Sequence, residues 1–232
     1  AYKKVLEKMQ GKRVVIRTLD VSEEPEISQW RYGDRVNPAM GFRAIRFSLR
    51  RPDLFLTQLR AILRASVYGK AAVLFPVVTS EEEVIKAKAL LQQARASLEA
   101  EGVPVADKIE IGIMIETPAA VILSDRLASM VDFFSIGTND LTQYILATDR
   151  MNDSIASLYN PRHPAVLRMI DMTVANAKKH GIWTSICGES AADAELLRFY
   201  LAMGVEELSV APSAVLELRR IVRQTTLGKH KD

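Results

Sequence analysis

The chain has 232 residues, of which 48% are apolar and 25% are charged, as expected of a globular domain with an ordinary surface. The formal net charge is only +3 and the basic residues are scattered, so nothing predicts nucleic-acid binding. No apolar run is long enough to cross a bilayer, and one cysteine leaves no internal disulfide. We therefore expect a cytoplasmic protein with no nucleic-acid partner and no membrane insertion.

Helical patterns alternate with short apolar runs along the whole chain. The predicted strands cover residues 14–16, 42–47, 71–78, 109–115, 131–136, 182–186 and 207–210. The clearest helix starts are Pro52, a capping box formed by Ser80 and Glu83, and Pro118. Further helices are expected over 2–9, 165–180 and 213–224, and two more after residues 138 and 187. This order predicts parallel strands connected by helices.

The fold that suits this alternation best is a (β/α)8 barrel, because nearly every strand reads as buried on both faces. We expect residues 1–232 to form a single domain and to be a fragment of a longer multidomain protein. Seven predicted strands are one short of eight, so the first strand is expected to be missing from this fragment. An open, doubly wound sheet is the alternative.

Polar side chains follow the predicted strands at their carboxyl ends. They are Arg17, Glu116, Asn139, Asp140 and Cys187, with Arg43 placed after the long loop that leaves the same face. In a barrel these ends open onto one face, where such folds carry their chemistry. Each residue also has a plain structural explanation. Asn139 or Asp140 could only cap a helix, Cys187 could be a small buried side chain, and the arginines could pair with Asp20 or Glu24 on the surface.

The chemistry of this set is narrow if its members share a cleft. Glu116 and Asp140 are hard oxygen ligands suited to Mg²⁺, which also takes oxygens from its substrate. Arginine matches phosphate and carboxylate groups with planar, bidentate donors. A thiol can act as a general acid or as a nucleophile. The set therefore predicts a site for a small phosphorylated carboxylic acid.

Five motifs resemble those of the phosphoenolpyruvate-binding domain of enzyme I, the phosphoenolpyruvate–protein phosphotransferase of the bacterial sugar phosphotransferase system. They are Arg17-Thr-Leu-Asp20, Gly41-Phe-Arg-Ala-Ile-Arg46, Glu116-Thr-Pro-Ala-Ala120, Phe134-Ser-Ile-Gly-Thr-Asn-Asp-Leu-Thr-Gln143 and Cys187-Gly-Glu189. They occur in the same order and cover nearly the whole chain. Pyruvate phosphate dikinase and phosphoenolpyruvate synthase contain a related domain.

The resemblance implies a role for each of these positions. Arg17, Arg43 and Arg150 would hold the phosphate of phosphoenolpyruvate, and Asn139 would hydrogen-bond the substrate. Glu116 and Asp140 would bind Mg²⁺. Cys187 would protonate the methylene carbon of enolpyruvate as pyruvate forms. The spacing of the sequence would not have selected Arg150, which lies a helix away from its strand, and His163 is interpreted as structural.

The resemblance also implies partners. They are a separate N-terminal domain that carries the acceptor histidine, a histidine-containing phosphocarrier protein, and a second copy of the chain in a homodimer. None of the three histidines, at positions 163, 180 and 230, lies in an acceptor motif. Whether a sugar or a nitrogen-regulatory pathway is served stays open.

One loop departs from the pattern of the family. Where a Gly-Gly-Asp-Lys loop usually follows the first arginine motif, this chain has Val21-Ser-Glu-Glu-Pro25, which adds acidic residues near an anionic ligand. A non-catalytic dimerising or metabolite-sensing relative is therefore one alternative. The related domain of a dikinase or of phosphoenolpyruvate synthase is another.

Overall fold

The computed structural model describes residues 1–20 and 39–227. Within it the chain forms two compact units, Ala1–Met114 and Ile115–Asp232. The loop Val21–Pro25 lies outside the described residues, as do residues 228–232. No helix in the described ranges has the length and apolarity that a membrane crossing requires.

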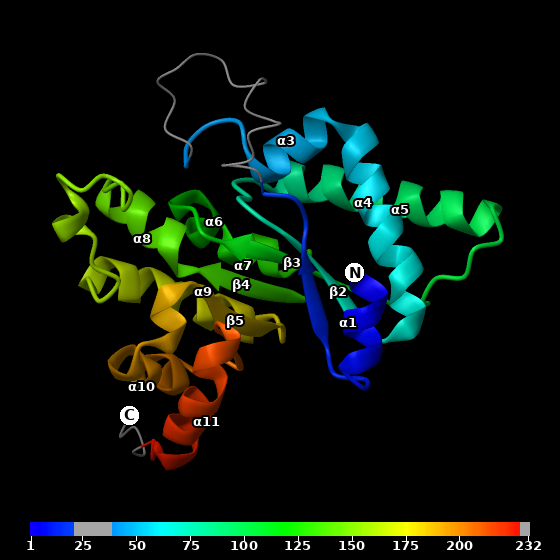
Figure 1. The fold of residues 1–232 in the computed structure, drawn as a ribbon. Helices are drawn as coiled ribbons and strands as arrows, with labels where there is room; N and C mark the ends of the chain where they lie inside the picture. Colours follow the sequence, from blue (N-terminus) through cyan, green and yellow to red (C-terminus); the bar gives the residue numbers. More distant parts are fainter. Residues whose placement is uncertain (21–38, 228–232) are drawn as a thin grey trace. The chain divides into compact units, whose positions relative to one another are not determined.

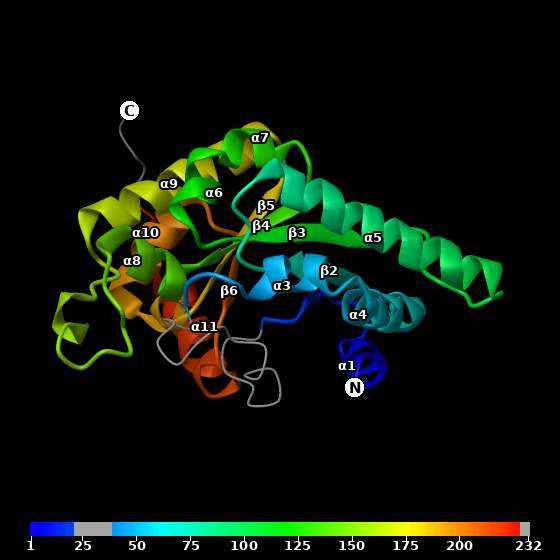
Figure 2. The same cartoon turned by 90° about the horizontal axis from the view of Figure 1, so that it is seen from above.

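The first unit has three parallel strands in the order β1-β2-β3, with helices between them (Figures 1 and 2). Its elements are α1 (Tyr2–Lys8), β1 (Val14–Arg17), α3 (Ala44–Arg50), α4 (Pro52–Ala65), β2 (Ala71–Phe75), α5 (Glu81–Ala100) and β3 (Glu110–Ile115), the last ending at the boundary between units. Val14 of β1 pairs with Ala71 of β2, and Val73 of β2 pairs with Ile111 of β3. All five residues of β2 are buried, as expected of an inner strand in a parallel sheet.

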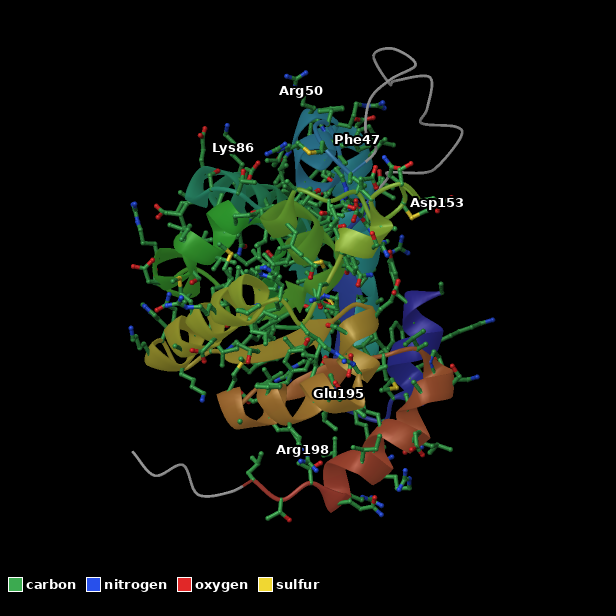
Figure 3. All side chains as sticks on the ribbon, turned by 90° about the vertical axis from the view of Figure 1, so that its left-hand side faces the viewer. Phe47, Arg50, Lys86, Asp153, Glu195 and Arg198 are labelled. Atoms are coloured by element: carbon green, nitrogen blue, oxygen red, sulfur yellow. The ribbon has the colours of Figure 1, made fainter. Side chains whose placement is uncertain are left out.

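Two helices of this unit, α4 and α5, begin where the sequence predicts. Pro52 is the first residue of α4, and the Ser80–Glu83 capping box opens α5, with both of its hydrogen bonds formed. The buried faces of α4 and α5 pack together, whereas Arg50 on α3 and Lys86 on α5 point outward into solvent (Figure 3). Local sequence signals are therefore sufficient to set these boundaries.

The second unit also has three parallel strands, in the order β4-β5-β6. Its elements are α6 (Pro118–Ile122), α7 (Ser124–Ala128), β4 (Phe133–Gly137), α8 (Thr138–Leu146), α9 (Pro164–Lys179), β5 (Trp183–Cys187), α10 (Ala194–Met203), β6 (Glu207–Ser209) and α11 (Val215–Gln224). Phe133 and Trp183 are paired in the sheet and their rings stack with centroids 4.2 Å apart. At the other end of the same two strands Gly137 pairs with Cys187, so α8 begins beside the cysteine.

One predicted strand is wrong. Residues 42–47 do not form a strand but lead into helix α3, whose residues Ala44, Ile45, Phe47 and Ser48 are buried. Their spacing of one, three and four positions is that of a helix face. Arg46 occupies a partly exposed position of the helix, whereas Arg43 is the buried residue that precedes it. The described residues thus contain six strands rather than seven. A single domain over residues 1–232 remains a prediction.

Candidate functional site

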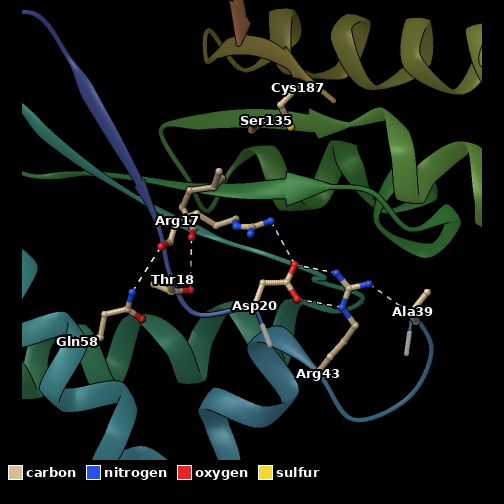
Figure 4. Close-up of polar contacts among 9 residues, drawn as sticks. Arg17, Thr18, Asp20, Ala39, Arg43, Gln58, Ser135 and Cys187 are labelled. Carbon is tan, nitrogen blue, oxygen red and sulfur yellow. Dashed lines mark hydrogen bonds and ion pairs between the residues drawn. The ribbon is translucent and has the colours of Figure 1, made fainter. Parts of the chain in front are cut away.

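In the first unit the two predicted phosphate-binding arginines meet at Asp20. Arg43 donates from Nε to Oδ1 of Asp20 at 3.0 Å and from Nη2 to Oδ2 at 2.7 Å (Figure 4). Arg17, the last residue of β1, donates from Nη1 to Oδ2 of Asp20 at 3.2 Å. We call these three residues the arginine–aspartate cluster. It brings two guanidinium groups together at the carboxyl end of a strand.

Burial distinguishes the members of the cluster. Only 8% of the Arg43 side chain and 4% of the Asp20 side chain are exposed, whereas 49% of the Arg17 side chain is exposed. The simple alternative of a surface ion pair is therefore wrong for Arg43 and Asp20. A buried charge is tolerated only when it is paired and hydrogen-bonded, and Asp20 supplies that partner. Sequence reasoning did not select Asp20 as a site residue, because nothing local distinguishes it from a loop acid.

Neighbouring elements fix the backbone that carries Asp20. The N–H of Thr18 donates to the carbonyl of Leu74 on β2 at 2.9 Å, which extends the pairing of β1 by one residue. The N–H of Leu19 then donates to Oε1 of Gln58 on α4 at 2.9 Å. Gln58 in turn donates from Nε2 to the hydroxyl of Tyr2 on α1 at 3.2 Å. The cluster is thus attached to a strand and two helices of its own unit.

In the second unit the thiol of Cys187 has two polar neighbours on β4. The hydroxyl of Ser135 donates to Sγ at 3.4 Å, and the thiol donates from Sγ to the carbonyl of Ile136 at 3.4 Å. Figure 4 shows Ser135 beside the sulfur. A carbonyl acceptor supports the protonated thiol, and a hydroxyl donor supports the thiolate, so both forms have a partner. These contacts suit a group that gives up and regains a proton.

The segment after Cys187 packs directly on the start of α8. We call residues 187–190 the Cys187 loop. The N–H of Glu189 donates to Oδ1 of Asn139 at 3.0 Å, and Thr138 donates from Oγ1 to the carbonyl of Cys187 at 2.9 Å. Gly188 has a φ of +103°, and a Cβ there would lie 2.6 Å from Oγ1 of Thr138. Only glycine permits both this backbone and this approach. The structure therefore brings Asn139 and Cys187 together.

Arg150 returns to the same loop. Its Nη1 donates to Oε1 of Glu189 at 3.1 Å, and its backbone N–H donates to Oε1 of Gln143 on α8 at 3.2 Å. The guanidinium is 35% exposed and its partner carboxylate 81% exposed, so this ion pair is a weak one that a ligand can replace. Only the resemblance had pointed to Arg150. In the structure its partner Glu189 directly follows Gly188, so Arg150 contacts the Cys187 loop.

The pKa of Tyr159 depends on charged groups of this region. Burial raises the pKa of the Tyr159 phenol. Arg150 acts on this pKa in the opposite direction, while the carboxylates of Glu189 and Asp140 add to the increase. Asp140 thus belongs to the same electrostatic neighbourhood as Arg150 and Glu189.

The two predicted metal ligands stand at the starts of helices of the second unit. Glu116 is 3% exposed and precedes Thr117, whose Oγ1 accepts the N–H of Ala120 as the N-cap of α6. Asp140 lies in the first turn of α8. Among the described residues no three histidine, cysteine or acidic side chains are grouped closely enough to hold a metal. Two carboxylates still fit Mg²⁺, which normally keeps waters and takes oxygens from its substrate.

His163 has a structural role, as interpreted from the sequence. It is the N-cap of α9, and its Nδ1 accepts the N–H of Ala165 at 3.2 Å. This contact satisfies one of the backbone donors that every helix start leaves without a partner.

Comparison with known protein families identifies the family of the chain. Residues 1–227 match the family described as PEP-utilising enzyme, PEP-binding domain. The chain is 46% identical over 232 residues to the phosphoenolpyruvate-protein phosphotransferase of Staphylococcus carnosus, covering all of this chain and 40% of that protein. It is 48% identical over 219 residues to the protein of the same name from Geobacillus stearothermophilus, covering 94% of this chain and 38% of the relative. The chain thus spans about 40% of the length of these relatives.

Solved structures are similar at the level of fold. Malate synthase from Haloferax volcanii, in a magnesium and glyoxylate complex, matches with a TM-score of 0.61 and 15% identity over 98% of this chain and 61% of its own. Pyruvate kinase from Pyrobaculum aerophilum matches with a TM-score of 0.52 and 17% identity over 75% of this chain and 39% of its own. These matches confirm the α/β fold of partial (β/α)8-barrel type. The family match extends over almost the whole chain, so the chain belongs to the phosphoenolpyruvate-binding domains of PEP-utilising enzymes.

Proposed function

We propose that the chain binds phosphoenolpyruvate with Mg²⁺ and is the catalytic part of a phosphoenolpyruvate–protein phosphotransferase. The observation that carries the proposal is the arginine–aspartate cluster, which holds two guanidinium groups at a strand end in a chain of this family. Guanidinium groups match phosphate oxygens in geometry and charge. The names of relatives 46–48% identical to this chain support the same activity.

Each site residue has a role in this proposal. Arg17, Arg43 and Arg150 neutralise the phosphate as its bond to the enol oxygen breaks and a bond to the acceptor histidine forms. Asn139 orients the substrate. Cys187 then transfers its proton to the methylene carbon of the enolate, and pyruvate leaves. The contacts of its sulfur with Ser135 and Ile136 support that proton transfer.

Glu116 and Asp140 would hold the metal. When bound, Mg²⁺ supplies positive charge to the oxygens of phosphate and carboxylate. Glu116 follows β3 and Asp140 lies in the first turn of α8, and the carboxylate oxygens of both are of the kind that Mg²⁺ accepts as ligands.

The resemblance supports three finer assignments. The acceptor histidine would lie on a separate N-terminal domain, a histidine-containing phosphocarrier protein would receive the phosphoryl group from it, and the chain would form a homodimer. The reaction would be the first step of the sugar phosphotransferase system, in the cytoplasm. The presence of a single cysteine agrees with a reducing compartment.

The direct test is calorimetric titration of phosphoenolpyruvate into the protein with and without Mg²⁺. We expect binding that requires Mg²⁺ and disappears in Glu116→Ala. Arg17→Ala should weaken binding by about 2 kcal/mol, the magnitude of a charge-assisted hydrogen bond, and change stability little because Arg43 still pairs with Asp20.

Two surface variants serve as matched controls. Glu217→Ala removes an exposed carboxylate on α11, and Arg51→Ala removes an arginine from an exposed ion pair with Asp53. Both should bind like the wild type. Absence of binding by the folded wild-type protein would reject the proposed function.

A further inference from the structure

A continuous chain of hydroxyl groups lies behind the Cys187 loop. Tyr200 on α10 donates from its hydroxyl to Oγ of Ser190 at 2.9 Å, and Ser190 donates to Oγ1 of Thr138 at 2.7 Å. Thr138 donates in turn to the carbonyl of Cys187 at 2.9 Å. The chain therefore joins α10, the Cys187 loop, the start of α8 and the end of β5.

The members of this hydroxyl chain are buried. Tyr200 and Thr138 are 0% exposed and Ser190 is 5% exposed. The hydroxyls of Ser190 and Thr138 each accept one hydrogen bond and donate one, so all hydrogen bonds of the chain run in the same direction. Buried hydrogen bonds in series strengthen one another, and leaving one partner unsatisfied costs more than the bond itself contributes.

The chain also limits where the loop can lie. Thr138 and Asn139 hold the loop at the carbonyl of Cys187 and the N–H of Glu189. Gly188 allows a close approach, since a Cβ would lie 2.6 Å from Thr138 and 2.8 Å from Asn139. The loop is thus bound on both sides of Gly188, and Tyr200 holds it at a third point through Ser190.

We propose that Tyr200, Ser190 and Thr138 are positioning residues that set the placement of the Cys187 thiol relative to Asn139. Tyr200 is the remote anchor, because its ring is packed in the core of the second unit and its hydroxyl starts the chain of donors. The sequence predicts none of this, since Tyr200 lies on a helix beyond the loop. The anchoring can be tested by itself, whereas its effect on catalysis depends on the proposed function.

The first measurement is hydrogen exchange of the backbone amides over residues 187–192. Tyr200→Phe should accelerate exchange there about fivefold, the factor for the loss of one neutral hydrogen bond. Ser190→Ala and Thr138→Val each remove two hydrogen bonds and should accelerate it more. Thr138→Ser and Ser190→Thr keep a hydroxyl and should restore the slow exchange.

A matched control separates this role from a general loss of stability. Thr173→Val removes another fully buried threonine hydroxyl, one that donates to the carbonyl of Met169 within α9. It should leave exchange over residues 187–192 unchanged. The rate of Cys187 alkylation by iodoacetamide gives a second readout, because the chain has one cysteine. It should rise in Tyr200→Phe and not in Thr173→Val.

The outcomes distinguish the two proposals. Unchanged exchange and alkylation in folded Tyr200→Phe and Ser190→Ala would overturn the anchoring, whether or not Thr138→Val folds. In the full phosphotransferase, Tyr200→Phe should lower kcat for pyruvate formation about fivefold and leave KM for phosphoenolpyruvate unchanged. If the wild type does not bind phosphoenolpyruvate, the proposed function fails, while hydrogen exchange still decides the anchoring.

Discussion

The two units hold their candidate site residues by different kinds of interaction. In the first unit the interaction is ionic, since the buried carboxylate of Asp20 pairs with the buried Arg43 and the half-exposed Arg17. In the second, Cys187 and Asn139 are held by neutral hydroxyl, thiol and backbone groups, and the ion pair between Arg150 and Glu189 is largely exposed. The residues proposed to meet phosphate are thus organised by charge, and those proposed to meet the reacting carbon by neutral hydrogen bonds.

The difference has a physical consequence. Breaking a buried ion pair leaves an uncompensated charge, whereas losing a neutral hydrogen bond leaves a dipole that a small shift or a water molecule can satisfy. Substitution in the arginine–aspartate cluster should therefore cause a large loss of stability. Substitution of the groups that hydrogen-bond around Cys187 should cost little stability and should mainly disturb the placement of the thiol.

The largest effect should come from Asp20→Ala, which leaves Arg43 buried without its partner carboxylate. We expect a loss of about 3–5 kcal/mol in the free energy of unfolding, measured by chemical denaturation. Asp53→Ala, which breaks an exposed ion pair with Arg51, should cost less than about 1 kcal/mol. Equal losses in the two variants would contradict the special role of burial in the Arg43–Asp20 ion pair.

A smaller effect is expected for Gly188→Ala in the Cys187 loop. The positive φ and the contact with Thr138 should cost about 1–3 kcal/mol and displace the loop. Gly181→Ala is the matched control, with a φ of +66° and open space around the added Cβ. It should cost less and leave Cys187 alkylation unchanged. Faster alkylation in both variants would show that the contact with Thr138 is unimportant.

Tyr200 gives a pH test of the neutral network. Burial raises the pKa of Tyr200 to about 12, although its hydrogen bond with Ser190 acts in the opposite direction. Since the folded state holds this proton more tightly than an ordinary tyrosine with a pKa of about 10, its contribution is complete below pH 10 and is lost as pH rises toward 12. The phenolate absorbance lost in Tyr200→Phe should therefore be absorbance that appears only as the pH approaches 12. Titration near pH 10 would show that the phenol is accessible.

The smallest effect concerns the exposed end of α10. Burial by itself would raise the pKa of Asp193, but hydrogen bonds from Arg162 and from the N–H groups of Glu195 and Leu196 outweigh burial and lower it. Its contribution is therefore present at neutral pH and lost on acidification below about pH 4. Asp193→Asn should cost about 0.5–1 kcal/mol at pH 7 and nothing at low pH, as followed by denaturation. A pH-independent loss would assign the effect to capping geometry and not to charge.

The sequence by itself determined most of the secondary structure. The capping box at Ser80, the proline at 52 and the buried runs of β2 and β4 are local signals, and the structure confirms them. We predicted a strand over residues 42–47 because six residues with two arginines fit a strand about as well as the start of a helix. Helical spacing becomes visible only when Ser48 is included.

Only the tertiary structure decided how the site residues are held. Arg43 meets Asp20 across 23 positions, Arg150 meets Glu189 across 39, and Ser190 meets Thr138 across 52. Tyr200 joins that network from a separate helix. The sequence offered Asp20 only as one of two possible surface partners of the arginines and did not indicate the other contacts. A hydrogen bond or an ion pair depends on distances and burial that the packing of strands and helices creates. Propensities act between neighbours in the chain, whereas the placement of Cys187 depends on neighbours in space.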